Sequence, residues 1–373
     1  MKILIIGVEP YSLTNFRGDL ISTLFKQDHT VIAVACGASD REIKKIEALG
    51  CKYIECPIVR TSVNPFLDIR TLFKLITVIK SEKPSHILPY TIKPVIWAGI
   101  ASLFFPSVKF IPLITGLGYA FGRGGLLRSI VKRLVTQLYR TSLGSADAII
   151  FQNRLNRQDF VDNGILTDQA NTFIVKGSGV NVDKFAYVPV TIDHQHVKFL
   201  MIARLLRDKG IQEYLEAAKK VKLQYPFSSF FLAGPPDDSP NAFSLEDIQP
   251  YIKSDIVTYL GPLKDVRNTI EECNVFVLPS YHEGMPRTVL ESMAIGRAVI
   301  TTDTAGCQET VIEGSNGWLV PAKNVEVLAS RMIWFLENPK RIVDMGAASR
   351  LFAEKSFEVN KINSDIVSIL NQV

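Results

Sequence analysis

The chain has 373 residues, and 47% of them are hydrophobic, which is enough to bury the cores of two ordinary α/β domains. Basic residues exceed acidic ones by 42 − 37 = 5, and the excess lies in residues 1–190 (23 − 14 = +9) rather than in 191–373 (19 − 23 = −4). The first half therefore favours anionic partners. The longest apolar run, Val95 to Phe105, is well below the ~20 residues of a bilayer-spanning helix, so no integral membrane protein is predicted.

The cysteine count argues against a disulfide framework or a zinc site. The five cysteines are odd in number and lack paired short spacings. They are typical of reduced thiols in a cytosolic protein. The start, MKILIIGVEP, is too short an apolar run for a signal peptide and is typical of a first buried strand.

Strand-like apolar runs alternate with helical periodicity along the chain, in two sets. The first set is Lys2 to Ile6, Thr30 to Ala35, Ile87 to Pro89, Lys109 to Leu113, Ala148 to Phe151 and Thr172 to Val175. The second set is Phe199 to Ala203, Phe230 to Ala233, Val257 to Leu260, Val275 to Leu278 and Ala298 to Thr301. This pattern predicts an α/β protein with two doubly wound, Rossmann-like parallel sheets.

The boundary between the two sets is predicted near Pro189, where the periodicity is lost. The N-terminal domain is therefore expected to span residues 1–190, and the C-terminal domain residues 191–356. The last segment, 357–373, has apolar residues at helical spacing, including Ile362 and Ile366, which predicts a final helix.

A glycine-rich loop follows the run Lys109 to Leu113. It contains Gly116 and Gly118, and such glycines let the backbone approach a phosphate or a sugar, or merely form a loose loop. Phe121 occupies the third glycine position of G-x-G-x-x-G, and the loop does not follow the first strand. NAD binding is therefore poorly supported.

A basic amphipathic segment, 123–140, comes next. It carries Arg123, Arg128, Lys132 and Arg133 and no acid, while its apolar residues keep helical spacing. Such a helix can lie on an anionic membrane surface. The alternative is an ordinary packed helix with a cationic outer face.

Two basic residues follow the first strand of the second set. Arg204 and Lys209, in A-R-L-L-R-D-K-G, can point to the carboxyl edge of the sheet and offset the charge of a departing diphosphate, or else form an ordinary solvated pair. Asp237 and Asp238 suggest a metal, but the chain has no D-x-D triplet, and we assign no metal ligands and no cofactor.

The segment 279–317 contains the most specific pattern. Pro279 ends a buried strand, Glu283 lies in the following loop, and a helix is predicted from about Thr288 to Gly296. Unpaired N–H groups near Thr288, Val289 and Leu290 would then bind phosphate at the sheet edge. Glu291 lies on the same helix, where it can reach a ribose, although Thr288-x-x-Glu291 is also a capping-box pattern.

The run E-G-M-P-R-T-V-L-E-S-M-A-I-G-R-A-V-I, followed by Gly306, Glu309, Gly314 and Gly317, resembles the donor-site signature of retaining GT-B glycosyltransferases of family 4. The resemblance covers the whole chain, weakly in the first half and strongly in the second. It implies two Rossmann-like domains facing a central cleft, with the last helix packing back on the first domain. The TGLG loop matches a subgroup similar to N-acetylgalactosaminyltransferases that act on undecaprenyl-diphosphate sugars, and lacks the histidine that many family members carry there.

The resemblance also implies roles for individual residues. Glu283 and the amides of Gly284 to Arg287 would hold the donor sugar, Arg204 and Lys209 the diphosphate, and Glu291 the ribose. The predicted donor site thus comprises Glu283, Gly284, Met285, Pro286, Arg287, Thr288, Val289, Leu290, Glu291, Gly234, Arg204 and Lys209, with Glu283, Arg204 and Lys209 as the catalytic residues.

Arg17, in the loop region after the first strand, and Lys93 would meet an acceptor diphosphate, with Gly116 and Gly118 beside it; surface basicity is the alternative for the two cations.

The sequence therefore predicts a metal-independent retaining glycosyltransferase that moves a hexose or N-acetylhexosamine from a UDP-sugar to a polyprenyl-diphosphate-linked saccharide in bacterial polysaccharide assembly. Its expected location is the cytoplasm, peripheral at the inner face of the cytoplasmic membrane, with no nucleic-acid partner. Two alternatives are a UDP-sugar epimerase on the same scaffold and a non-catalytic nucleotide-sugar-binding partner of an assembly complex.

Overall fold

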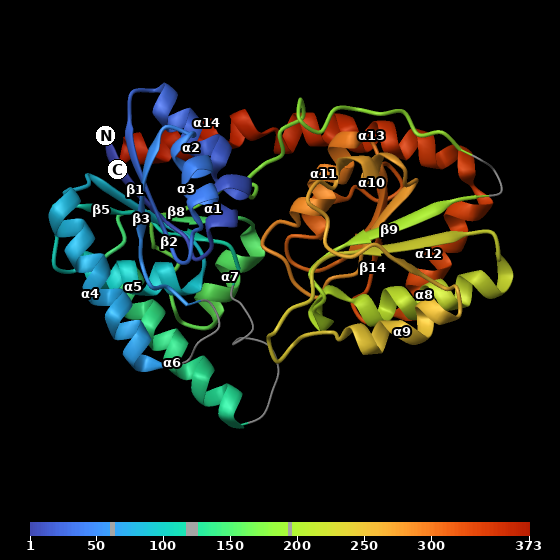
Figure 1. Ribbon diagram of the computed structural model, residues 1–373, viewed down its shortest axis with the longest axis horizontal. Helices are drawn as coiled ribbons and strands as arrows, with labels where there is room; N and C mark the ends of the chain where they lie inside the picture. Colours follow the sequence, from blue (N-terminus) through green and yellow to red (C-terminus); the bar gives the residue numbers. More distant parts are fainter. Residues whose placement is uncertain (60–63, 117–125, 193–195) are drawn as a thin grey trace. The chain divides into compact units, whose positions relative to one another are not determined.

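The computed structural model describes residues 1–59, 64–116, 126–192 and 196–373. The chain divides into two compact units, Met1–Ser178 with Asn360–Val373 (unit 1) and Gly179–Val359 (unit 2) (Figure 1). The segment that follows Ser178, expected in the first domain, packs on unit 2, because Val180 and Phe185 are buried in the core of that unit. Arg350 also donates hydrogen bonds to the carbonyl of Phe185 at 2.9 Å and to that of Val182 at 3.0 Å.

Unit 1 contains parallel strands in the order β3-β2-β1-β4-β5, and a further set in the order β6-β7-β8. The strands are β1 (Lys2–Ile6), β2 (Thr30–Ala35), β3 (Cys51–Glu55), β4 (His86–Pro89), β5 (Lys109–Phe110), β6 (Leu113–Ile114), β7 (Ile149–Phe151) and β8 (Thr172–Ile174). The single strand expected over Lys109 to Leu113 is divided into β5 and β6. Pro112 lies at the break and has no N–H to donate to a ladder.

Helices cover both faces of the unit 1 sheet. They are α1 (Pro10–Phe16), α2 (Gly18–Lys26), α3 (Asp40–Glu47), α4 (Pro65–Glu82), α5 (Ile92–Ser102), α6 (Leu126–Leu143), α7 (Arg154–Asp162) and α14 (Val359–Gln372). Successive residues of β1 point to opposite faces. Ile3 and Ile5 pack with α2 and with the C-terminal residues Ile362 and Ile366 of α14, whereas Leu4 packs with α4, α5 and α6.

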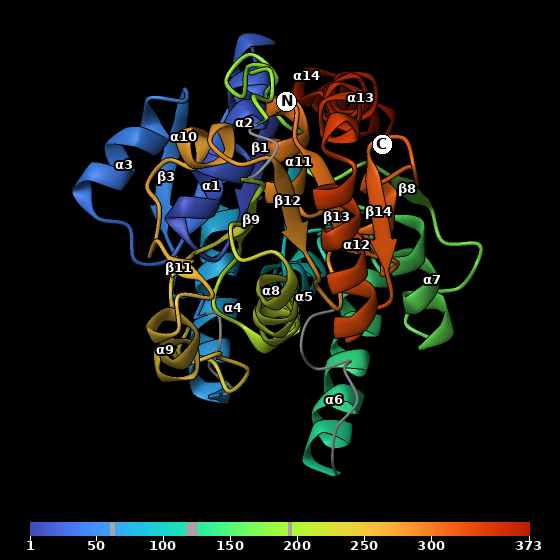
Figure 2. The ribbon, with the colours of Figure 1, turned by 90° about the vertical axis from the view of Figure 1, so that its right-hand side faces the viewer.

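Unit 2 is a six-stranded parallel sheet in the order β11-β10-β9-β12-β13-β14 (Figure 2). The strands are β9 (Lys198–Ile202), β10 (Ser229–Ala233), β11 (Thr258–Tyr259), β12 (Val275–Leu278), β13 (Ala298–Thr302) and β14 (Gly317–Val320). The helices are η2 (Arg207–Lys209), α8 (Ile211–Gln224), α9 (Leu245–Lys253), α10 (Arg267–Glu271), α11 (Arg287–Ile295), η3 (Gln308–Thr310), α12 (Val325–Glu337) and α13 (Pro339–Phe357). Parallel sheets in both units, with helices between the strands, confirm the predicted α/β class.

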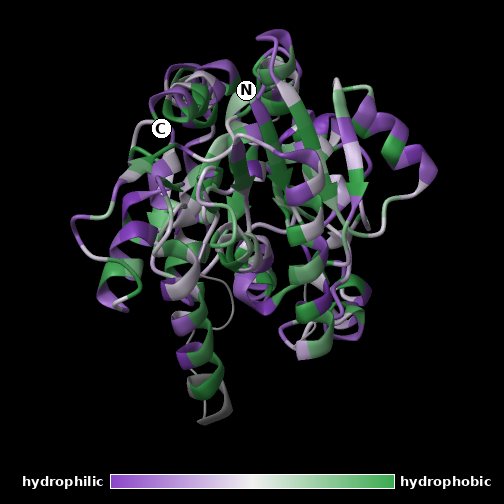
Figure 3. Cartoon of the chain, turned by 90° about the vertical axis from the view of Figure 1, so that its left-hand side faces the viewer, coloured by the Kyte–Doolittle hydropathy of each residue, from purple (hydrophilic) through white to green (hydrophobic). Residues whose placement is uncertain are grey.

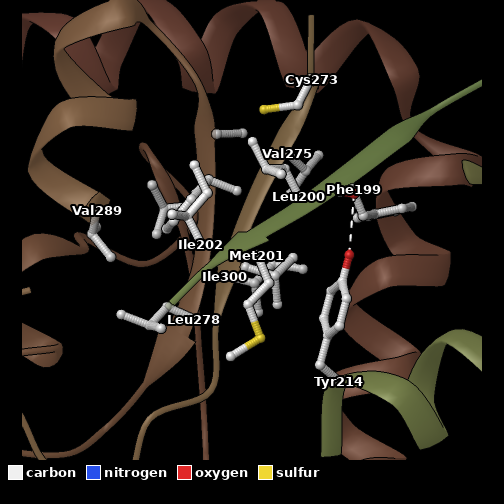
Figure 4. Close-up of a cluster of buried hydrophobic side chains, with 14 of the residues drawn as sticks. Phe199, Leu200, Met201, Ile202, Tyr214, Cys273, Val275, Leu278, Val289 and Ile300 are labelled. Carbon is white, nitrogen blue, oxygen red and sulfur yellow. Dashed lines mark hydrogen bonds between the residues drawn. The ribbon is translucent and has the colours of Figure 1, made fainter. Parts of the chain in front are cut away.

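The core of unit 2 is built from the two central strands and the helices on them (Figure 4). Val275 of β12 pairs with Phe199 of β9, and both are completely buried. The hydroxyl of Tyr214 from α8 donates to the carbonyl of Phe199 at 3.1 Å, so this buried polar atom is satisfied. The loops at the carboxyl ends of β9 and β12 are therefore anchored on a rigid core.

Among the described residues, no helix combines the length and the apolarity that crossing a bilayer requires.

Candidate functional site

The predicted donor residues gather at the carboxyl edge of the unit 2 sheet, where the strand order changes direction. The chain builds outward from β9 to β11 on one side and from β12 to β14 on the other. In open α/β sheets, ligands bind at such a switch point, outside the carboxyl ends of the strands. Arg204 and Lys209 follow β9, and Glu283 and Glu291 follow β12, so this fold brings the four charged residues to one edge.

Lys209 and Glu283 form an ion pair. Nζ of Lys209 lies 2.7 Å from Oε1 of Glu283, and each side chain is only 17% exposed. Burial lowers the pKa of Lys209, but the Glu283 carboxylate more than offsets this, so the pKa is raised and the ammonium stays charged. The pair is far less screened than a surface salt bridge, and a bound anion would have to compete with Glu283 for Lys209.

Two glycines allow the loops around this pair to approach each other. Gly210 has φ +75°, and a Cβ there would lie 2.1 Å from the carbonyl oxygen of Pro279. Gly306, after β13, has φ +76°, and its Cβ would lie 2.5 Å from the carbonyl oxygen of Gly284. The N–H of Glu283 also donates to the carbonyl of Ala305 at 3.1 Å. The backbone that carries Glu283 is therefore fixed by loops from β9 and β13.

Arg204 also forms an ion pair, and its partner is Asp237, which the sequence did not assign to this site. Its Nη1 lies 2.8 Å from Oδ2 of Asp237, which is 9% exposed, while Arg204 itself is 39% exposed. Gly234 has φ +145°, and a Cβ there would lie 1.8 Å from the carbonyl oxygen of Ala203, so glycine is required for the β10 loop to pass the end of β9. Gly234 thus shapes this edge through close backbone approach.

Glu291 is buried at the start of α11. Its Oε1 accepts from Nε of Arg287 at 2.8 Å, and its side chain is 9% exposed. Burial raises the pKa of Glu291, and the Arg287 guanidinium opposes this effect. The N-cap of α11 is Pro286, with no side-chain capping bond, so the capping-box interpretation of Thr288 and Glu291 is wrong.

The helix begins at Arg287, one residue before the expected start, and this changes which N–H groups are available. The N–H groups of Val289 and Leu290 both donate to the carbonyl of Pro286, at 3.1 and 3.2 Å. The expectation that both are unpaired is therefore wrong. Of the three N–H groups, that of Thr288 has no acceptor among the described residues. Met285, also predicted in this loop, packs against the hydrophobic core of unit 2.

Asp208 is a partly buried carboxylate beside the Lys209–Glu283 pair, and the sequence did not indicate it as a site residue. Burial raises its pKa; Lys209 opposes the shift, and Glu283 adds to it. Its backbone carbonyl accepts from the N–H of Tyr281 at 2.8 Å and from the hydroxyl of Ser280. Asp208 therefore connects the β9 loop to the β12 loop, a long-range contact without a local sequence signal.

In unit 1, Arg17 is buried rather than on the surface. It is 3% exposed, and its guanidinium carbon lies 5.1 Å from the centroid of the Tyr90 ring. The Tyr90 hydroxyl in turn shares a 2.7 Å hydrogen bond with the hydroxyl of Ser12. The surface-basicity alternative for Arg17 is therefore wrong, and the side chain lies beside the residue that directly follows β4.

The other predicted acceptor residues lie in the loops after β4 and β6. Lys93, near the start of α5, forms a 2.8 Å ion pair with Asp68 of α4, and each side chain is 17% exposed. Gly116 has φ +137°, a conformation that L side chains rarely adopt. Gly118 lies outside the described residues. Thr91, which sequence analysis did not select, has φ 68° and ψ 165°, and its hydroxyl is buried without a hydrogen-bond partner among the described residues.

The predicted membrane segment is largely helix α6. Arg128, Lys132 and Arg133 belong to it, whereas Arg123 lies outside the described residues. Arg133 is exposed, and Lys132 is partly buried.

Two family models match the chain. The family described as "Glycosyl transferase 4-like" matches residues 2–153, and "Glycosyl transferases group 1" matches residues 188–352. Among curated relatives, the N,N'-diacetylbacillosaminyl-diphospho-undecaprenol alpha-1,3-N-acetylgalactosaminyltransferase of Campylobacter jejuni is 29% identical over 340 residues, 88% of each chain. The capsular polysaccharide biosynthesis glycosyltransferase CapM of Staphylococcus aureus is 22% identical over 84% of this chain and 83% of its own.

Solved structures share the fold. Sucrose-phosphate synthase from Thermosynechococcus elongatus superposes with a TM-score of 0.80 at 20% identity, over 100% of this chain and 98% of its own. HepE from Anabaena in complex with UDP-glucose superposes with a TM-score of 0.77 at 16% identity, over 100% of both chains.

Proposed function

The chain is a glycosyltransferase of GT-B fold, and on this premise we propose that it is a retaining enzyme that moves a sugar from a UDP-sugar to a polyprenyl-diphosphate-linked saccharide. The sugar is a hexose or an N-acetylhexosamine, with GalNAc or GlcNAc preferred. The observation that carries the proposal is the buried Lys209–Glu283 pair, with Arg204, at the switch point of the unit 2 sheet. These charges suit a diphosphate next to a sugar.

The donor would bind by exchanging protein partners for ligand atoms. Lys209 and Arg204 would leave Glu283 and Asp237 for the diphosphate, assisted by the N-terminus of α11. Glu283, released from Lys209, would accept hydrogen bonds from hydroxyls of the donor sugar. One oxygen of Glu291 accepts from Arg287, and its other oxygen is the acceptor we assign to the ribose.

The chemical step we propose needs no enzyme nucleophile. The acceptor hydroxyl attacks the anomeric carbon from the face on which the diphosphate departs, through an oxocarbenium-like state. The bond between the anomeric carbon and the phosphate oxygen breaks, its electron pair stays on the UDP, and the hydroxyl proton passes to the departing phosphate. Lys209 and Arg204 would stabilise the negative charge that grows on the departing diphosphate. Such stabilisation by fixed charges is usually the largest single contribution to lowering the activation barrier.

Unit 1 would bind the acceptor. The buried guanidinium of Arg17 and the ammonium of Lys93 are the cations at the carboxyl ends of β1 and β4, and Gly116 lies after β6. The Campylobacter jejuni relative is named for an undecaprenol-linked diphospho-sugar, and this supports a lipid-diphosphate acceptor here. We further propose that the basic segment 123–140 holds the enzyme peripherally at the inner face of the cytoplasmic membrane, through Arg123, Arg128, Lys132 and Arg133.

The test is a panel of UDP-sugars incubated with the full chain and a short-chain polyprenyl-diphosphate disaccharide, read by product mass. A product heavier by one N-acetylhexosamine or hexose, with the donor's anomeric configuration kept, supports the proposal. Epimerised UDP-sugar without transfer would identify an epimerase, and donor binding without turnover a non-catalytic partner. EDTA should leave the rate unchanged, because Lys209 and Arg204 supply the positive charge; a requirement for Mg²⁺ or Mn²⁺ would contradict this part.

A further inference from the structure

Helix α4 of unit 1 exposes a line of large apolar side chains. Phe66 is 80% exposed, Ile69 48% and Phe73 65%, and their spacing of three and four residues places them on one face of the helix. The opposite face, with Leu75, Val78 and Ile79, is buried in the core beneath the sheet. The exposed line is therefore additional to the apolar face that folding requires.

The charges on the same exposed face are all positive. Arg70, Lys74 and Lys80 of α4 are exposed. The two acids of this helix are engaged elsewhere: Asp68 pairs with Lys93 at 2.8 Å, and Glu82 bonds Lys2 and Lys52 at 3.0 and 2.6 Å. The outer face of α4 thus combines apolar side chains with cations that form no ion pair with the described residues.

Helix α6 shows the same combination. Ile130 is 58% exposed, Val131 40% and Leu134 60%, with the exposed Arg133 among them. In Figure 3, hydrophobic and hydrophilic residues alternate along this helix, which extends to the bottom of the view. Helix α5 packs against both α4 and α6, and all three helices cover one face of the unit 1 sheet. The exposed lines therefore lie on the outer surface of one helical layer.

Both lines lie toward the edge of the sheet where the acceptor residues are found. Helix α4 runs from the carboxyl end of β3 toward the amino end of β4, and its exposed apolar residues occupy its first half. The exposed apolar residues of α6 likewise occupy its first half. Since Asp68 holds Lys93, the first turns of α4 lie directly beside the start of α5. An occupant of this surface would adjoin the loops after β4.

We propose that the α4 stripe, defined as Phe66, Ile69 and Phe73 with the flanking Arg70 and Lys74, inserts into the surface of an anionic lipid bilayer next to α6. Its apolar side chains enter the boundary between headgroups and acyl chains, and its cations remain at the phosphates. This inference rests on the proposed function, because a lipid-linked acceptor is confined to that bilayer. It adds a second exposed apolar line, on α4, to the one that α6 carries beside its cations.

The first test is sedimentation of the full chain with vesicles of phosphatidylglycerol and phosphatidylethanolamine. The variant Phe66→Ser/Ile69→Ser/Phe73→Ser should partition at least tenfold more weakly than the wild-type chain. The matched control is Leu223→Ser/Phe227→Ser in unit 2, where the two side chains are 80% and 68% exposed, and it should partition normally. All five side chains lie at the surface, and melting temperatures of the variants verify that folding is intact.

A second measurement reports insertion rather than attraction. Phe73→Trp should gain fluorescence that lipids brominated on the acyl chain quench, and Phe227→Trp should gain fluorescence that they do not quench. Neither experiment needs a donor or an acceptor, so both remain decisive if the proposed transferase activity fails.

Unchanged partitioning of the α4 variant, equal losses in the control, or an unquenched signal from the Phe73→Trp variant would each overturn the proposal. A wild-type dimer in solution that the α4 variant converts to a monomer, with vesicle binding unchanged, would assign the stripe to a second copy of the chain instead.

Discussion

The two units present different chemistry at the carboxyl edges of their sheets. In unit 2 the charged residues are paired with one another, as Lys209 with Glu283, Arg204 with Asp237 and Arg287 with Glu291. In unit 1, Lys93 is likewise paired with Asp68, and the guanidinium of Arg17 lies over the Tyr90 ring. A diphosphate at either edge must therefore compete with a carboxylate for a lysine ammonium, and the unit 1 edge adds an aromatic contact to one of its cations.

The units also differ in how they form their tightest turns at these edges. In unit 2 the positive φ angles beside the predicted site fall on glycines, such as Gly210, Gly234 and Gly306. In unit 1 the turn after β4 places φ 68° on Thr91, next to Tyr90. Glycine adopts these angles at low cost, and a β-branched residue does not. The donor edge thus follows the ordinary rules of local structure, and the acceptor edge departs from them.

The largest expected effect comes from removing a cation of the unit 2 edge. Lys209→Ala should lower turnover by about 10²-fold or more, because a buried positive charge no longer stabilises the departing diphosphate. Arg204→Ala should have a similar or smaller effect, since Arg204 is 39% exposed and more screened by water. Steady-state kinetics with the UDP-sugar that turns over in the panel would measure both.

Arg207→Ala is the matched control. Arg207 lies in the same loop, is 56% exposed and pairs with Asp247 on the side of α9. It should leave turnover and UDP affinity unchanged. Near-normal rates in both Lys209→Ala and Arg204→Ala would remove the donor site from this edge.

Reversing the charge of α6 tests whether unit 1 binds the bilayer in which the lipid-linked acceptor lies. Replacing Arg128, Lys132 and Arg133 by Glu should abolish sedimentation with anionic vesicles, since each cation near the surface contributes about 1 kcal/mol. Turnover of a long-chain lipid acceptor should fall by up to about 10²-fold, as ~3 kcal/mol of attraction is lost. Turnover of a short water-soluble acceptor should be spared. Equal losses with both acceptors would instead assign these residues to catalysis or packing.

A smaller effect is expected from Glu291→Gln. UDP should bind about tenfold more weakly, because the ribose loses an ionised acceptor. Isothermal titration with UDP measures this, and Glu272→Gln, an exposed residue at the end of α10, is the control that should bind normally. Normal UDP affinity of Glu291→Gln would remove Glu291 from the ribose site.

The stability of the Glu291→Gln variant relative to the wild-type chain should depend on pH. Burial raises the pKa of Glu291 in the folded state, so its contribution to stability is present below the unfolded pKa near 4.5 and is lost as the pH rises through the folded pKa. At pH 7 the ionised group therefore costs stability, and Glu291→Gln should raise the melting temperature slightly. This gain should shrink toward pH 4. A gain that is the same at pH 4 and pH 7 would contradict an ionised, buried Glu291.

Local patterns in the sequence were sufficient for most of the fold. Buried parallel strands are short apolar runs, and β12 with Val275 and Leu278 begins and ends where the run does. β3 and β14 were missed, because their sequences CKYIE and GWLV are too short or too mixed to form such a run. Pro112 shows a limit of the same kind, since its missing N–H divides an otherwise continuous apolar run.

The charged residues of the donor edge could be selected from the sequence, but their partners could not. Glu283 and Lys209 were chosen separately from two loops, and nothing in either loop indicates that they form an ion pair. Asp237 was considered only as a metal ligand, because its contact with Arg204 depends on how the β9 and β10 loops meet. Thr91 was missed because a positive φ angle at a threonine contradicts local propensity and becomes visible only in the backbone.

Relieving the turn at Thr91 is the smallest expected change, and it separates the two edges most directly. Its φ of 68° and ψ of 165° fall in a region that is essentially restricted to glycine and costs about 1–3 kcal/mol for other residues. Thr91→Gly removes this cost but adds about 0.5–1 kcal/mol of chain entropy to the unfolded state. The free energy of unfolding should therefore rise by about 1 kcal/mol, as measured by urea denaturation. Turnover with the lipid-linked acceptor should fall, because Thr91 directly follows Tyr90, on which Arg17 stacks.

Lys83→Gly is the control, since Lys83 also has a positive φ, 47°, but lies at the C-terminus of α4. It should gain stability without any change in turnover. If Thr91→Gly is destabilised, or if it is more stable with the rate of Lys83→Gly, then Thr91 is an ordinary turn residue and the acceptor edge is built by the same rules as the donor edge.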